Sequence, residues 1–79
     1  MELGWWSRDD DGRKFQINVR VFGKKLQWRC QRERFEPWTE YGPPTDEDWD
    51  KALELVENRF QRKLVREDVV KLVRERRLE

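Results

Sequence analysis

The stretch that decides the fold is residues 14–31, which read Lys14-Phe15-Gln16-Ile17-Asn18-Val19-Arg20-Val21-Phe22-Gly23-Lys24-Lys25-Leu26-Gln27-Trp28-Arg29-Cys30-Gln31. Apolar residues alternate with polar ones on both sides of its centre, which is the pattern of two half-buried strands. Gly23-Lys24 fits a two-residue hairpin loop. This loop sets Val21 against Leu26, Val19 against Trp28 and Ile17 against Cys30. A slip of one residue would lose the match between apolar partners, so the sequence predicts both the hairpin and its register.

A third strand is expected before this hairpin, because Asp9-Asp10-Asp11-Gly12 has the composition of a turn. In a strand over residues 3–8, Leu3 and Trp5 share one face, whereas Trp6 falls on the other. The sequence therefore predicts a three-stranded antiparallel meander with strands near 3–8, 13–21 and 26–35.

The second half predicts two helices, near residues 46–62 and 66–77. Thr45 and the acidic residues after it form a helix start. One apolar stripe then follows at helical spacing, and we expect it to cover the apolar face of the sheet: Trp49, Ala52, Leu53, Val56, Phe60 and Leu64. A later set, Val65, Val69, Leu72 and Val73, lies about half a turn away, so the helix should break between Gln61 and Arg66.

These elements predict an α+β fold in which the first helix packs on the apolar face of the meander. With 79 residues, the chain is long enough for one small domain. We divide it into a β-meander (1–36), a connection rich in Pro, Gly and aromatic residues (37–44) and a helical half (45–79). The predicted core is Trp5, Phe15, Ile17, Val19, Val21, Leu26, Trp28, Cys30, Trp49, Leu53, Val56, Phe60, Val69 and Leu72.

Composition argues against several classes of function. The chain has no His and one Cys, and its four glycines stand apart, so we expect no enzymatic activity, no metal site and no nucleotide or other cofactor. Cys30 is interpreted as a packed thiol. The absence of a long apolar run and of a signal peptide predicts a cytoplasmic protein with no membrane partner. The terminal pair Leu78-Glu79 resembles a vector-derived tail.

Our first functional hypothesis is a non-catalytic module that binds a protein partner or forms a homodimer. The second apolar stripe requires a surface to cover it, and a second chain would supply one. A basic ridge lies beside this stripe. The expected contact residues are Val65, Val69, Leu72 and Val73, with Lys71, Arg74 and Arg77.

The alternative hypothesis is binding of DNA or RNA by the polar face of the sheet. Basic and amide side chains predominate on that face, and such side chains bind phosphates and base edges. The candidate residues are Trp6, Lys14, Arg20, Lys24, Lys25 and Arg29. The competing interpretation is a solvated face that keeps the sheet soluble. The net charge is only +1, but the acidic residues between positions 46 and 57 should lie behind the sheet, on the first helix.

Overall fold

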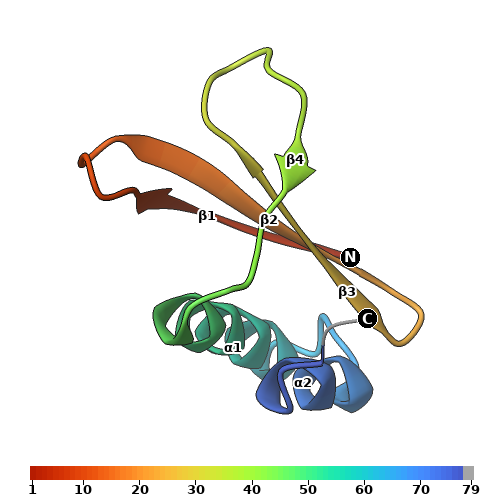
Figure 1. Ribbon diagram of the computed structural model, residues 1–79. Helices are drawn as coiled ribbons and strands as arrows, with labels where there is room; N and C mark the ends of the chain where they lie inside the picture. The colour runs from red at the N-terminus through yellow and green to blue at the C-terminus, as the bar shows by residue number, and fades with distance from the viewer. Residues whose placement is uncertain (78–79) are drawn as a thin grey trace.

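The computed structural model describes residues 1–77 and has the predicted α+β architecture (Figure 1). The pair Leu78-Glu79, interpreted above as a possible tail, lies outside the described residues. The elements follow one another in the order β1 (Glu2–Arg8), β2 (Lys14–Phe22), β3 (Lys25–Gln31), β4 (Thr39–Glu40), α1 (Asp46–Gln61) and α2 (Glu67–Arg74).

The four strands form one antiparallel sheet in the order β1-β2-β3-β4. The predicted hairpin register is confirmed, because Val21 lies opposite Leu26, Val19 opposite Trp28 and Ile17 opposite Cys30. Gly23 has a φ of 59°, which a two-residue hairpin loop requires and which glycine adopts without steric cost.

The core lies between the apolar face of the sheet and the two helices, which are both on that side (Figure 1). Trp28 is at the centre of the core. The centre of its ring is 4.9 Å from the ring centre of Trp49 and 5.7 Å from that of Trp5. Tyr41 contributes a third neighbouring ring at 6.2 Å. Because both helices cover one face, the other face of the sheet is left without a covering element among residues 1–77.

The start of α1 is held by a set of hydrogen bonds around Asp48. The Thr45 hydroxyl accepts from the Asp48 amide at 3.2 Å, and the Asp48 carboxylate accepts from the Thr45 amide at 2.9 Å, which completes a capping box. The Tyr41 hydroxyl donates to the same carboxylate. Burial, followed by this bond and the charge of Asp48, raises the pKa of Tyr41 above its ordinary value. The predicted helix start is therefore correct, and Tyr41 adds a link to the sheet.

The predicted break between the helices is confirmed, and the backbone explains it. Lys63 has a φ of 60°, and the amides of Lys63 and Leu64 donate to the carbonyls of Phe60 and Arg59. This pattern of bonds is a Schellman motif, which ends a helix. The same motif at Arg76 (φ 54°) ends α2 at Arg74, so the predicted end at residue 77 was three residues too late.

Several predictions about the core were wrong. Phe60 and Leu64 are exposed, although both belong to the stripe that was expected to cover the sheet. Four residues are buried although none of them was in the predicted core: Leu3, Ala52, Val70 and Val73. The residues that are half-buried and pack against the core, rather than lying fully inside it, are Trp5, Cys30, Leu53, Val69 and Leu72.

Two predictions about the strands also need correction. The third strand ends at Gln31 instead of residue 35, because the chain turns at Glu33–Glu36, where the Glu36 amide donates to the Glu33 carbonyl. The short strand β4 lies inside the segment that we interpreted as a connection. It adds a fourth strand beside β3 and was not predicted.

Candidate functional site

The candidate site is the uncovered face of the sheet, hereafter the open face. It is formed by the residues of β1, β2 and β3 that point away from the helices: Glu2, Gly4, Trp6, Arg8, Lys14, Gln16, Asn18, Arg20, Phe22, Lys25, Gln27, Arg29 and Gln31. Five of these side chains are basic and one is acidic. The predicted polar face thus exists as one continuous surface.

Exposed aromatic side chains lie among these polar residues. Trp6 is 64 % exposed, which is a large apolar area for a single side chain to leave in water. Phe22 is also exposed at the other end of β2. Sequence reasoning did not assign Phe22 to the site. Phe22 lies two residues after Arg20 on β2, and residues two apart on a strand point to the same face.

Arg29 is held in the middle of the open face by its neighbours. Its Nη2 donates to Asn18 Oδ1 at 3.1 Å and lies 3.6 Å from Glu2 Oε1. Its guanidinium carbon is 5.5 Å from the centre of the Trp38 ring, a cation–π contact. The side chain is only 25 % exposed. Arg29 therefore contacts Trp38 on this face, and only the part of Arg29 that remains exposed can contact a ligand.

Trp38 is a site residue that sequence reasoning missed. The strand pairing of Cys30 with Thr39 and of Arg29 with Glu40 brings the segment before β4 alongside β3. No periodic pattern marks a strand of two residues, so the sequence contains no signal that could have placed Trp38 beside Arg29.

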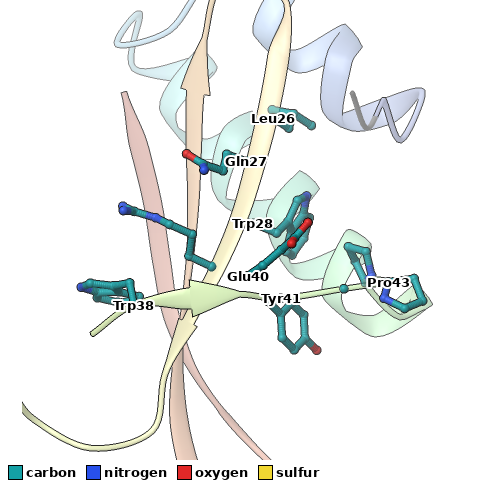
Figure 2. Close-up of a pocket in the computed structure, with 10 residues that line it drawn as sticks. Leu26, Gln27, Trp28, Trp38, Glu40, Tyr41 and Pro43 are labelled. Carbon is teal, nitrogen blue, oxygen red and sulfur yellow. The ribbon is translucent and has the colours of Figure 1, made fainter. Parts of the chain in front are cut away.

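An open cleft of about 670 Å³ lies where β4 leaves the sheet (Figure 2). Trp38 and Gln27 lie on one side of the β3 ribbon in this view, whereas Leu26 and Pro43 lie on the other. The cleft thus extends from the open face around the edge of β3 toward the helices. Its wall combines the aromatic rings of Trp28, Trp38 and Tyr41 with the charged side chains of Arg29 and Glu40.

A second cleft, of about 460 Å³, is lined by charged side chains at the far end of the sheet: Arg13, Lys14, Arg32, Glu33 and Glu36. Asp9 lies beside it and accepts hydrogen bonds from the Arg13 amide at 2.9 Å and from Arg32 Nη1 at 2.7 Å. The hydrogen bond from the Arg13 amide is the largest cause of a lowered pKa at Asp9, and the bond from Arg32 lowers the pKa further. Asp9 therefore remains ionised and orders the turn.

The predicted nucleic-acid contacts form a line instead of a cluster. Lys14 and Arg20 are six residues apart on β2, which is about 20 Å at the rise of a strand. Arg20 Nε lies 3.6 Å from Glu2 Oε1. Lys24 and Lys25 are at the hairpin tip, next to Phe22. A ligand that contacts all of these residues must therefore be extended.

The predicted partner-binding residues of the second helix are placed differently from what the hypothesis requires. Val73 is 2 % exposed, and Val65, Val69 and Leu72 are half-buried against the core. The turn at Lys63 reverses the chain and brings this second stripe onto the same core as the first. The second apolar stripe is thus covered by the protein's own core, although it lies about half a turn away from the first stripe. Lys71, Arg74 and Arg77 remain exposed, and partner binding through them stays a prediction.

Two further observations concern residues 1–77. No three acidic, Cys or His side chains in this part of the chain come together as metal ligands. None of its helices is both long and apolar enough to cross a bilayer.

Comparison with known proteins adds no assignment. The chain matches no family model, and no curated protein or solved structure matches it. The chemistry of the open face is therefore the basis for a functional proposal.

Proposed function

We propose that this protein binds single-stranded nucleic acid along the open face of its sheet. The observation that carries the proposal is that both helices pack on one side of the sheet, which leaves Trp6 and a line of basic residues uncovered on the other. Proteins that bind single strands combine such a basic track with aromatic side chains on which bases stack.

The aromatic side chains favour a single strand over a duplex. Trp6 and Trp38 are on opposite sides of the face, the first on β1 and the second before β4. In a duplex the flat faces of the bases are already stacked on one another, whereas an unpaired base can stack on an indole ring. Such stacking contributes about 1–3 kcal/mol per base.

The distribution of charge supports the same ligand. On β1, β2 and β3 the open face carries five basic side chains against Glu2, and Lys24 adds a further charge at the hairpin tip. The acidic residues of α1 belong to the layer on the opposite side of the sheet. A nearly neutral chain can therefore present a positive face to a polyanion.

A salt titration tests the proposal quantitatively. A labelled single-stranded oligonucleotide is titrated with the protein at several salt concentrations and compared with a duplex of the same length. Five phosphate contacts, from Lys14, Arg20, Lys24, Lys25 and Arg29, predict a slope of log K against log salt of about −3.5 on the single strand. On a duplex the same contacts would give about −4.5. We expect the single strand to bind more tightly.

Two matched double charge reversals locate the binding face. Lys14→Glu/Arg20→Glu changes the open face, whereas Lys71→Glu/Arg74→Glu makes the same change in net charge on α2. The first pair should reduce affinity strongly and the second only slightly. Equal losses from both pairs would assign the effect to net charge alone. Binding no tighter than about 10⁻⁴ M at low salt would reject the proposal.

A further inference from the structure

The outer edge of β1 is a second unpartnered surface of the sheet. The Val21 amide donates to the Met1 carbonyl and the Asp9 amide to the Arg13 carbonyl, so the odd-numbered residues of β1 direct their backbone groups toward β2. The even-numbered residues direct theirs outward. Arg59 Nη1 occupies one outward group, the Glu2 carbonyl, at 2.7 Å. From Gly4 to Arg8, no strand of residues 1–77 pairs with this edge.

We propose that this edge pairs with the same edge of a second copy of the chain, forming an antiparallel homodimer with a continuous eight-stranded sheet. Unpaired strand edges are templates for further strands, and natural proteins usually protect them with charges, bulges or covering segments. Here the described chain covers only the start of the edge, at Glu2. The inference does not depend on the proposed binding of nucleic acid.

The sequence of β1 selects one register for this pairing. A two-fold axis through Trp5 sets Gly4 against the partner's Trp6 and Glu2 against the partner's Arg8. Both pairs then join residues with outward backbone groups, as antiparallel bonding requires. The Glu2 carbonyl, which accepts from Arg59 Nη1, has a second lone pair for the partner's Arg8 amide. Glu2 and Arg8 carry opposite charges and point to the same face, so at each end of the interface the partner's Arg8 would join Arg20 and Arg29 beside the Glu2 carboxylate. An axis through Trp6 would instead leave Glu2 beyond the end of the partner's strand, opposite Asp10 of its turn, and would lose the Glu2–Arg8 pair.

Gly4 and Trp6 are sterically complementary in this register. Gly4 lies on the open face and carries no side chain, so it leaves room for another chain to approach the strand closely. The partner's Trp6 would lie over this gap and cover part of a ring that is 64 % exposed in the monomer. By the two-fold symmetry, each chain provides one gap and one ring. The register thus matches both charge and shape.

A pair of single charge reversals provides the decisive test. In the proposed register, Glu2→Arg sets two arginines against each other at both ends, and Arg8→Glu sets two glutamates against each other. Each variant alone should raise the dimer Kd by about fivefold to tenfold. An equimolar mixture should restore association, because the mixed dimer pairs Arg with Glu at both ends.

Sedimentation equilibrium at several protein concentrations provides the measurement. The wild-type chain should rise from its monomer mass of 9.9 kDa toward twice that value, and the mixture should follow it. Circular dichroism establishes that each variant is folded. A wild-type chain that stays monomeric up to millimolar concentration would overturn the proposal. So would folded variants whose mixture associates no better than either variant alone.

Gly4→Thr separates the interface from the fold. A Cβ at Gly4 would meet its nearest neighbour, the Ile17 carbonyl oxygen, at 3.5 Å, which is an ordinary van der Waals contact. The monomer therefore has room for a Cβ at this position, and threonine has the higher strand propensity. In the dimer, however, the new side chain fills the gap that the partner's Trp6 would cover. Unchanged dimerisation in a folded Gly4→Thr variant would reject the proposed register.

Discussion

At the scale of single residues, Trp28 connects the sheet to the rest of the core. Its ring is near those of Trp5, Tyr41 and Trp49, which come from three different segments. We expect Trp28→Ala to lower the free energy of unfolding by about 3–5 kcal/mol, because it leaves a large cavity in a small core. Denaturation by urea measures this loss.

Trp28→Phe is the matched control for that variant. The indole Nε1 is buried and has no hydrogen-bond partner among residues 1–77. Phenylalanine removes this group and keeps most of the ring contacts, so it should be much less destabilising than alanine. Equal losses from both variants would contradict the central position of the ring.

The raised pKa of Tyr41 predicts that the protein loses stability at alkaline pH. Its pKa in the folded chain is raised above the ordinary value of 10.0 by burial and by the Asp48 carboxylate. The contribution of Tyr41 to stability is therefore fully present below pH 10.0 and is lost as the pH rises above that value. The reason is that the tyrosine hydroxyl ionises at a lower pH in the unfolded chain than in the folded one. Tyr41→Phe should weaken this alkaline loss. Urea denaturation at a series of pH values from neutral to alkaline checks the difference; parallel curves for both proteins would contradict it.

At the scale of elements, the helix ends show how the chain turns without glycine. Lys63 occupies the left-handed position of the Schellman motif after α1, where a residue with a Cβ is strained. We expect Lys63→Gly to raise the free energy of unfolding by about 0.5–1 kcal/mol. Urea denaturation provides the measurement.

The control for this variant is a glycine at the preceding position, the C-cap residue Arg62, which has a φ of −89°. Arg62→Gly relieves no left-handed strain and should lower stability slightly, since glycine has more freedom in the unfolded chain. A stabilising effect at both positions would show that the strain at residue 63 is not the cause.

At the scale of the whole molecule, α2 packs its apolar face into the core. Val70 and Val73 are 3 % and 2 % exposed. Val70→Asp buries an unpaired carboxylate, so it should unfold most of the chain at neutral pH. Lys71→Asp, at the next position, is exposed and should leave the fold intact. Circular dichroism and thermal melting distinguish the two; a stably folded Val70→Asp variant would contradict the place of α2 in the core.

The sequence by itself determined the hairpin, its register and the start of α1. Each of these depends on residues that are close in the chain: the alternation around Gly23, and Thr45 with Asp48. It also placed Trp6 on the polar face, because parity along a strand assigns each side chain to one of two faces.

Only the tertiary structure decided the destination of the second apolar stripe, the pairing of β4 and the position of Trp38 beside Arg29. The break between the helices could be predicted from the offset of the two stripes, but the direction of α2 depends on left-handed backbone at Lys63, a residue type with no preference for it. A strand of two residues has no periodicity, so its pairing comes entirely from contacts with β3. Contacts between distant segments depend on the directions in which the chain leaves its turns, and local pattern does not encode those directions.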